Sequence, residues 1–251
     1  MKNLQIPTMR PQPGHFYAVG IGPGSPDMLT VRAARLVEGC DTIISPQAKG
    51  SSRSLALEAV QPFVDRQEII VNNYPMERNG EKSRKRWHLF AEEVVRRCAA
   101  GESVVQITLG DPLIFATSSY LLQSLSEMMP AANIHVVPGI SAFQIAASRF
   151  AETLTLQEDR LMLMSATDLS AVERALGQCE TLVLYKAGTC IDALMDLLCR
   201  HNLLDRARLV SCCEQGEHEL LLDDLPSWQS RPLNYMTTMI VRIGSRPWLE
   251  G

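Results

Sequence analysis

Strand-like and helix-like segments alternate almost strictly along residues 15–137, and this alternation constrains the fold more than any other feature of the sequence. Short β-branched or aromatic runs predict strands, and longer stretches with apolar residues at helical spacing predict helices. Such alternation is typical of a mainly parallel sheet that is covered by helices. The predicted strands are 15–21, 41–45, 67–75, 102–110 and 133–139, and the predicted helices are 26–39, 52–63, 82–100 and 117–129.

The pattern restarts after residue 140 and changes character toward the end of the chain. Strands that follow one another with little helix between them favour antiparallel pairing, which we expect for the last three. We therefore predict an α/β protein with a loose tail over 1–13, an N-terminal domain over 14–138 and a C-terminal domain over 139–251. The cleft between two such domains is the expected ligand site. The predicted helices here are 141–150, 168–176 and 189–201, and the strands are 160–166, 180–188, 207–214, 218–225 and 236–243.

Composition argues against several classes of partner, although a local basic patch stays possible in an acidic chain. The formal net charge of −4 disfavours nucleic acid and anionic membranes, and no apolar run approaches the roughly 18 residues that span a bilayer. Seven cysteines without a C-x-x-C motif are typical of reduced thiols, so we predict a cytoplasmic protein. The five histidines lack metal-ligand spacing, and we expect no protein metal site.

The loop "VGIGPGSPD" follows the first predicted strand and resembles a dinucleotide fingerprint only superficially. That fingerprint needs a third glycine where Ser25 stands, and Pro23 and Pro26 remove two N–H donors that would hold a phosphate. A glycine-proline loop still turns sharply and leaves its backbone bare for a close ligand. A tight turn without any ligand stays open as the alternative.

Two further turns carry candidate site residues. In "TLGDPLIFATSSYLL" a Gly-Asp-Pro turn places Asp111 at the carboxyl end of a strand, where open α/β sheets bind ligands; a role as a helix-capping turn residue stays open. In "VPGISAFQIAA" a Pro-Gly turn leads Ser141 and Ala142 into a helix at the domain junction.

Together the three turns, in this order and spacing, resemble the tetrapyrrole (corrin/porphyrin) methylase family over nearly the whole chain from residue 15. The stretches "PQAKGSSRSLALEAV", "NNYPMERNGEKSRKRW" and "LVLYKAG" are similar to its precorrin-2 and cobalt-factor II C(20)-methyltransferase branch. The resemblance implies two α/β domains with the active site in the cleft between them, and a homodimer. It implies a methyltransferase of cobalamin biosynthesis that uses S-adenosylmethionine and acts on a tetrapyrrole, either precorrin-2 or its cobalt form.

The resemblance also implies site residues. Asp111 is a candidate proton acceptor, although a cofactor contact is the role we expect for it. Lys49 and Arg53 follow the second predicted strand and are expected to bind substrate carboxylates; the run Lys82, Arg84, Lys85, Arg86 and His88 is either a second source of cations or a solvated helix face. The residues expected to contact the cofactor are Pro23, Gly110, Asp111, the backbone around Leu113–Ile114, Ser141, Ala142, Tyr185, Lys186, Thr238 and Met239. For Lys186, a solvated strand end stays open as the alternative.

One departure from the family pattern concerns Ser25, which stands where the family loop usually carries an aspartate. A carboxylate role there is either vacant or moved to Asp27. The rival functions are another methylase of the same fold (a different precorrin step, diphthine synthesis or ribosomal RNA ribose methylation), a nucleotide-binding oxidoreductase, and a non-catalytic homologue.

Overall fold

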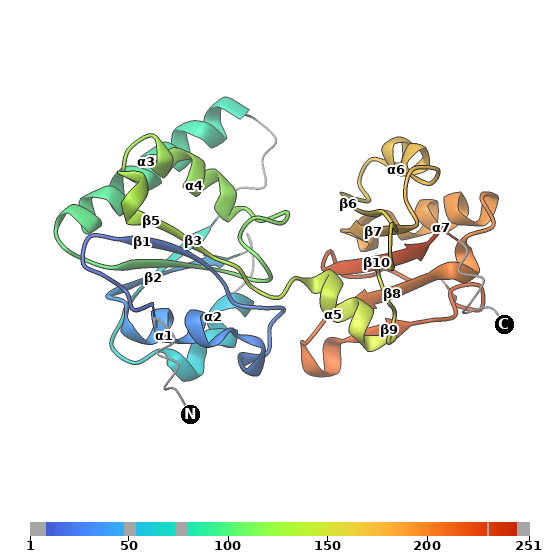
Figure 1. Cartoon of the computed structure of the whole chain (residues 1–251), viewed down its shortest axis with the longest axis horizontal. Coiled ribbons are helices and arrows are strands. Elements are labelled where there is room, and N and C mark those ends of the chain that lie inside the picture. The colour runs from blue at the N-terminus through green and yellow to red at the C-terminus, as the bar shows by residue number, and fades with distance from the viewer. Residues whose placement is uncertain (1–8, 48–53, 74–79, 230, 245–251) are drawn as a thin grey trace. The chain divides into compact units, whose positions relative to one another are not determined.

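The computed structural model describes residues 9–47, 54–73, 80–229 and 231–244. The chain divides into two compact units, 1–141 and 142–251, so the units separate a few residues after the predicted domain junction. Each unit is built on one five-stranded sheet covered by helices, which confirms the predicted α/β class (Figure 1).

The first unit has a wholly parallel sheet of order β3-β2-β4-β1-β5, as the alternation predicted. Successive residues of a strand point to opposite faces, so Phe16 and Ala18 pack among α3 and α4 while Tyr17 and Val19 pack with α1 and α2. The strands are β1 (Phe16–Gly20), β2 (Thr42–Gln47), β3 (Glu68–Asn73), β4 (Val104–Thr108) and β5 (Ile134–Val137). The helices are α1 (Val31–Gly39), α2 (Leu55–Val60), α3 (Gly80–Ala99) and α4 (Ser118–Ser126).

The predicted start of the first helix at Pro26 is wrong. Residues Pro26–Met28 form a separate 3₁₀ turn, and Leu29 is extended before α1 begins at Val31. The N-cap of α1 is Thr30, whose side chain accepts a hydrogen bond from the Ala33 amide at 3.1 Å. Ser25 makes no capping bond because its hydroxyl donates to the Asp27 carboxylate instead.

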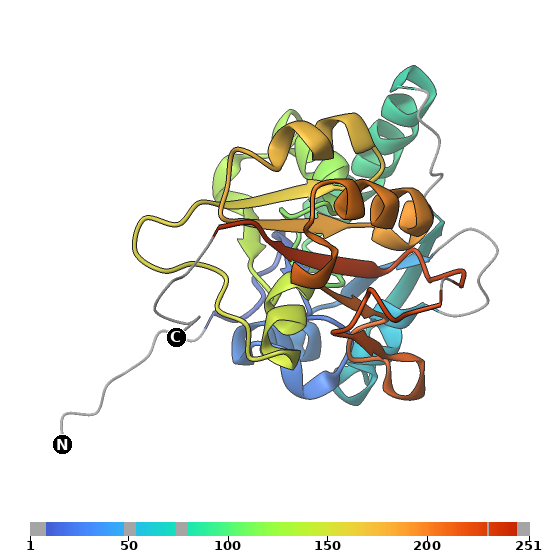
Figure 2. The ribbon, with the colours of Figure 1, turned by 90° about the vertical axis from the view of Figure 1, so that its right-hand side faces the viewer.

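The second unit has a mixed sheet of order β6-β7-β10-β8-β9, in which β6 and β7 are parallel. Strand β10 is antiparallel to β7 and β8, and β8 to β9, as expected for the closely spaced final strands. Helices α6 and α7 cover one face and α5 packs on β10 from the other (Figure 2). The strands are β6 (Leu161–Ser165), β7 (Thr181–Tyr185), β8 (Ala207–Ser211), β9 (Leu220–Leu222) and β10 (Thr237–Arg242), and the helices are α5 (Ala142–Arg149), α6 (Leu169–Ala175) and α7 (Ile191–Arg200).

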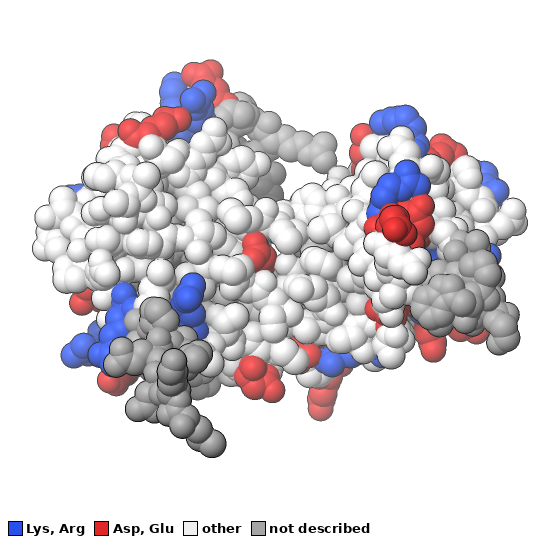
Figure 3. Space-filling view, viewed as in Figure 1, with Lys and Arg blue, Asp and Glu red and all other residues white. Residues whose placement is uncertain are grey.

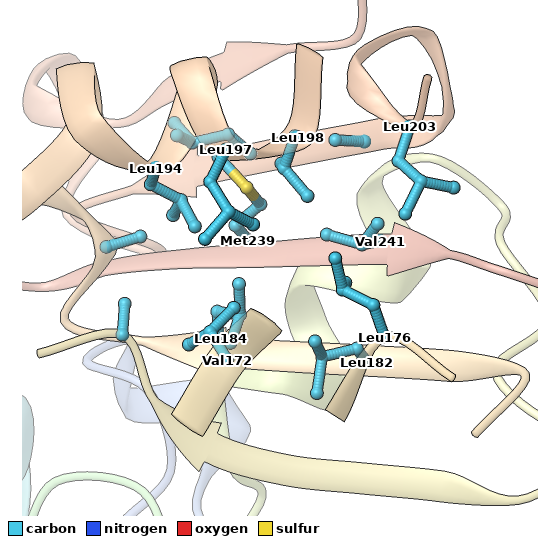
Figure 4. Close-up of a cluster of buried hydrophobic side chains, with 14 of the residues drawn as sticks. Val172, Leu176, Leu182, Leu184, Leu194, Leu197, Leu198, Leu203, Met239 and Val241 are labelled. Atoms are coloured by element: carbon cyan, nitrogen blue, oxygen red, sulfur yellow. The ribbon is translucent and has the colours of Figure 1, made fainter. Parts of the chain in front are cut away.

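The core of the second unit lies between the sheet and α6 and α7 (Figure 4). Leu182 and Leu184 of β7 and Met239 and Val241 of β10 alternate toward these helices, and all four are buried. Strand β8 ends at Ser211, so Cys212 and Cys213 lie in the turn after the strand rather than at its predicted end; both are buried.

Candidate functional site

The carboxyl ends of β1, β4 and β5 lie side by side, because these three strands are parallel neighbours in the sheet. The connection from β1 leads to α1 on one face, whereas the connection from β4 leads to α4 on the other. Adjacent strands whose connections diverge in this way open a crevice at their carboxyl ends, where ligands of α/β proteins bind. We call the loops that leave these strands, residues 20–24, 110–111 and 139–141, the glycine edge.

Backbones approach each other at the glycine edge too closely for any side chain. A Cβ atom on Gly20 would lie 2.5 Å from the Gly139 nitrogen and 2.6 Å from the Gly110 oxygen, and one on Gly139 would lie 2.3 Å from the Gly110 oxygen. Gly22 has φ of +75°, and its carbonyl accepts a hydrogen bond from the Gly110 amide at 2.7 Å. The three loops therefore pack against one another through main-chain atoms, and two of them are joined by a main-chain hydrogen bond.

The Asp111 carboxylate also ties these loops together. It accepts hydrogen bonds from the amide of Gly139 at 3.1 Å and from the amide of Leu113 at 2.8 Å, and its side chain is buried. Both oxygens are thus engaged in holding loop backbone. Asp111 thus holds turn backbone but caps no helix, because the N-cap of α4 is Thr117. The roles of Asp111 as cofactor contact and as proton acceptor stay predictions.

The structure brings together the first-unit residues that were predicted to bind the cofactor. Pro23 is buried in the β1 loop, Ile114 is half-buried after β4, and Ser141 is buried after β5. Space stays open beside Gly110, since a Cβ atom there would meet only the Ser141 Cα, at 3.9 Å. The glycine edge can therefore offer bare backbone to a ligand.

The predicted second-unit residues gather where β7 ends and β10 begins. Tyr185 pairs with Thr238 across the two strands, and Lys186 follows with a left-handed backbone, φ 62° and ψ 24°. The Lys186 ammonium lies 5.6 Å from the centre of the Tyr235 ring. Ala142 is the first residue of α5.

Met239 differs from the other predicted residues. Its side chain points into the hydrophobic core of the second unit and is fully buried (Figure 4). Its strand, β10, is paired on both sides, with β7 and with β8, so the strand's main-chain groups are committed to the sheet. Nothing in this geometry leaves Met239 open to a ligand.

Sequence reasoning missed a turn at the same end of the second sheet. Cys212 and Glu214, directly after β8, have φ of 52° and 60°, and the Cys212 amide donates to the Met236 carbonyl at 2.9 Å. We call Lys186, Cys212 and Glu214 the left-handed edge. Residues other than glycine rarely adopt this conformation, so a lysine, cysteine or glutamate in the sequence does not indicate it. Strained backbone of this kind clusters at functional sites.

Arg149 braces this turn by binding two carboxylates. Its guanidinium contacts Glu214 at 2.5 Å and Glu219 at 3.0 Å. Burial acts to raise the pKa of Glu219, but the hydrogen bond and charge of Arg149, together with hydrogen bonds from the Glu214 amide and the Cys213 thiol, hold that pKa below its usual value. Burial raises the pKa of the Cys213 thiol to about 12, which keeps it protonated and unreactive at neutral pH.

The predicted substrate cations are placed only in part. Lys49, Arg53 and the side chain of Lys82 lie outside the described residues. Arg84, Lys85, Arg86 and His88 are exposed on the first half of α3, where Lys85 pairs with Glu81 at 3.1 Å. Among the described residues, no group of three or more His, Cys, Asp or Glu side chains could hold a metal ion. In the same ranges, no helix is both long and apolar enough to cross a membrane.

Comparison with known proteins agrees with this geometry. The family model described as "Tetrapyrrole (Corrin/Porphyrin) Methylases" matches residues 15–216, which include both the glycine edge and the left-handed edge. The chain belongs to this family. The tetrapyrrole methylase resemblance predicted from the three turns is therefore confirmed.

Two curated relatives from within this methylase family cover most of the chain. The cobalt-precorrin-2 C(20)-methyltransferase of Salmonella typhimurium is 32% identical over 239 residues, which are 91% of this chain and 96% of that protein. The precorrin-2 C(20)-methyltransferase of a Sinorhizobium species is 25% identical and covers 87% and 98%. A solved uroporphyrin-III C-methyltransferase of Thermus thermophilus, complexed with S-adenosyl homocysteine, shares the fold with a TM-score of 0.60 at 20% identity, covering 91% and 97%.

Proposed function

We propose that this methylase transfers a methyl group from S-adenosylmethionine to carbon 20 of cobalt-precorrin-2 in cobalamin biosynthesis. The observation that carries the proposal is the 32% identity to a cobalt-precorrin-2 C(20)-methyltransferase along nearly the full length of both chains. The relative named for the metal-free substrate is less similar, at 25% identity. This difference favours the cobalt form as substrate, with precorrin-2 as the second candidate.

The methyl donor fits the residues present at the glycine edge. The open space beside Gly110 and the tightly packed glycine backbones would let a ligand approach main-chain N–H and C=O groups closely. We assign cofactor contacts to Pro23, Gly110, Ile114 and Ser141 in the first unit. In the second unit we assign them to Ala142, Tyr185, Lys186 and Thr238, and we exclude the buried side chain of Met239.

S-adenosylmethionine supplies a methyl group already activated by the positive sulfur. Carbon 20 forms a bond to that methyl as the carbon–sulfur bond breaks, S-adenosylhomocysteine leaves, and the methylated carbon later loses a proton. No protein nucleophile is required. The chain's residues therefore have to orient two ligands and exclude water, and alignment alone contributes several kcal/mol to such reactions.

Asp111 supports this alignment by fixing the loops that would hold the donor. Its carboxylate orients main-chain groups of Leu113 and Gly139, which makes it a positioning residue in our proposal. The proton from the methylated carbon leaves to water or to a base that we do not assign. Lys49 and Arg53 are proposed to bind peripheral carboxylates of the substrate, because guanidinium and ammonium groups pair well with carboxylates.

We also propose that the enzyme is a cytoplasmic homodimer. All seven cysteines are free thiols, and this supports a reducing compartment. The dimer is supported by the family resemblance. Light scattering coupled to gel filtration tests it directly, and a mass of one chain, about 28 kDa, would contradict it.

Two measurements test the proposed function. Calorimetry with S-adenosylhomocysteine should show binding to one site per chain, and absence of binding would reject the methylase assignment. Incubation with S-adenosylmethionine and either cobalt-precorrin-2 or precorrin-2 should add one methyl to carbon 20, with the cobalt form turned over faster. Methylation of another tetrapyrrole but of neither of these would support a different methylase of the same fold.

A further inference from the structure

Three residues in the segment 113–120, directly after the Gly-Asp-Pro turn, carry exposed apolar side chains that the proposed cofactor contacts do not explain. Leu113 is 63% exposed, Phe115 47% and Tyr120 57%, which is unusual for large apolar residues gathered within one short segment. We call these three residues the apolar platform. Large apolar side chains that are exposed together on one segment of a folded protein point to a site for a ligand or a partner.

The backbone that carries the apolar platform is held in place. The Leu113 amide donates to the Asp111 carboxylate at 2.8 Å, and the hydroxyls of Ser118 and Ser119 donate to the Pro112 carbonyl at 3.2 and 3.1 Å. Phe115 has φ of 49°, a left-handed conformation that is strained for an aromatic residue. Such strain persists only where the surroundings impose it, and it points to function. The segment thus presents Leu113 and Phe115 in a fixed way.

Aromatic and cationic groups flank the platform on α3. The Tyr120 ring stacks on Trp87 with centroids 5.9 Å apart and an interplanar angle of 24°. Arg84 precedes Trp87 by three residues, so it lies on the same side of the helix one turn earlier. Within the described parts of the chain Arg84 forms no ion pair, whereas its neighbour Lys85 is paired with Glu81. Charged side chains gather over this amino end of α3 (Figure 3).

We propose that the apolar platform binds a flat face of the tetrapyrrole macrocycle and that Arg84 pairs with one of its peripheral carboxylates. A macrocycle offers a broad, rigid apolar face and an anionic rim, and exposed apolar side chains beside a guanidinium that pairs with no described carboxylate complement both. The platform follows Gly110 and Asp111 directly, so the bound ring would lie next to the proposed methyl donor. The inference rests on the proposed function for the identity of the ligand.

Binding without turnover tests the platform. Trp87 lies against Tyr120, so cobalt-precorrin-2 added without a methyl donor should quench tryptophan fluorescence and yield a Kd. Phe115→Asn keeps a residue type that tolerates the left-handed region but removes the ring, and Leu113→Ser removes the other apolar side chain. Each variant should raise the tetrapyrrole Kd about tenfold and leave the Kd for S-adenosylhomocysteine within twofold. Leu89→Ser is the matched control, because Leu89 is 65% exposed but belongs to α3 on the side away from Trp87.

The charge contact has its own test. Arg84→Gln should raise the tetrapyrrole Kd several-fold at low salt and reduce its dependence on salt concentration, since a screened ion pair is lost. Arg174→Gln, an exposed arginine on α6, is the control and should leave both quantities unchanged. An unchanged salt dependence in Arg84→Gln would remove Arg84 from the proposal.

The outcomes separate this inference from the proposed function. If the wild type methylates carbon 20 and the two platform variants bind tetrapyrrole as the wild type does, the inference fails and the function stands. If the wild type binds the macrocycle through the platform but does not methylate it, the function fails and the inference stands. If Phe115→Asn and Leu113→Ser change the oligomeric state instead of the tetrapyrrole Kd, the platform is a self-association surface and the inference is overturned.

Discussion

Both units have left-handed backbone in the turns that follow their strands, but different residue types adopt it in each unit. At the glycine edge of the first unit, the positive φ angles fall on Gly22, Gly24 and Gly110. At the left-handed edge of the second unit, they fall on Lys186, Cys212 and Glu214. Both edges lie where strands end and turns begin, and both carry residues that we assign to the cofactor or that flank such residues.

The two edges differ in whether a side chain can be accommodated. Glycine is required in the first unit because backbone atoms occupy the space where a Cβ atom would lie. In the second unit the side chains are retained although the backbone is strained, which costs on the order of 1 kcal/mol per residue. Contacts made by these side chains offset that cost. Glu214 makes an ion pair with Arg149, and we propose that Lys186 contacts the cofactor.

The largest expected effect is the replacement of Gly139 by alanine. The new methyl would lie 2.3 Å from the Gly110 oxygen, so the first unit should lose about 3 kcal/mol of stability or fail to fold. Gly177→Ala is the control, because a Cβ atom there meets nothing within 4 Å. Urea denaturation of both variants measures the difference, and equal stability would show that backbone contact does not demand glycine at this edge.

Asp111→Ala should produce the next largest effect. It removes two hydrogen bonds to loop amides and should destabilise the first unit by about 2 to 3 kcal/mol. Calorimetry should show weaker binding of S-adenosylhomocysteine, because the loops at Gly139 and Leu113 are no longer held. Asp111→Asn keeps the acceptor oxygen and should recover part of both losses. If Asn binds the ligand as weakly as Ala does, then the negative charge matters more than the clamp.

At the left-handed edge, Lys186→Gly should separate stability from binding. Glycine adopts φ of 62° without strain, so stability should rise by up to about 1 kcal/mol, while the affinity for S-adenosylhomocysteine should fall several-fold. Ala151→Gly is the control, since Ala151 also has positive φ, at 48°, and is assigned no contact. Lost stability together with unchanged affinity in Lys186→Gly would contradict our account of this edge.

The smallest expected effect concerns pH and the opposite end of the first sheet. His15 Nδ1 and His135 Nε2 are 2.8 Å apart, and burial, together with the charge of His15, lowers the pKa of His135. The unfolded chain then binds a proton more readily than the folded one, so stability falls as the pH drops through about 6.5, the ordinary histidine value.

In the second unit, the hydrogen bonds and charge of Arg160 lower the pKa of Glu180 to about 2. That stabilising contact is present above the ordinary glutamate pKa, about 4.3, and is lost only as the pH falls below it. The contact therefore contributes no pH dependence between pH 7.5 and 5.5.

The test compares His135→Gln with the wild type over this pH range. The variant lacks the titrating imidazole, so its urea midpoint should drop less than that of the wild type. Equal drops in the two proteins would assign the sensitivity to other groups.

The sequence predicted most of the fold because the elements follow simple periodicities. The helix predicted over 82–100 is present as α3, and its apolar residues at helical spacing pack into the core: Trp87, Ala91, Val94 and Cys98 are buried, and Phe90 and Val95 are half-buried. The start of α1 was misplaced because Ser25 and Pro26 satisfy every local rule for a helix start, whereas the Ser25 hydroxyl is committed to Asp27. Local rules do not register such competition between side chains.

The glycine edge could be predicted from the sequence, because the glycines that its close backbone packing requires are themselves the signal of a tight turn. The left-handed edge was not readable, since Cys212 and Glu214 are ordinary residues in an uncommon conformation. Met239 was placed near the cofactor by resemblance, and strand alternation alone could have indicated that its side chain faces the opposite side from Thr238. The residues of the apolar platform are plain in the sequence, but the exposure of their side chains could not be predicted from it, because exposure depends on the folded chain.

The position of β10 has a consequence for how the protein is made. It is the last strand of the described chain, yet it lies between β7 and β8 at the centre of the second sheet. Nascent proteins tend to fold from the amino terminus as domains emerge from the ribosome. The first unit can therefore complete its sheet as soon as β5 is synthesised. The second unit must keep Leu182, Leu184 and Leu209 without their central partner until residues 237–242 arrive, and this interval is when the chain most needs protection from aggregation.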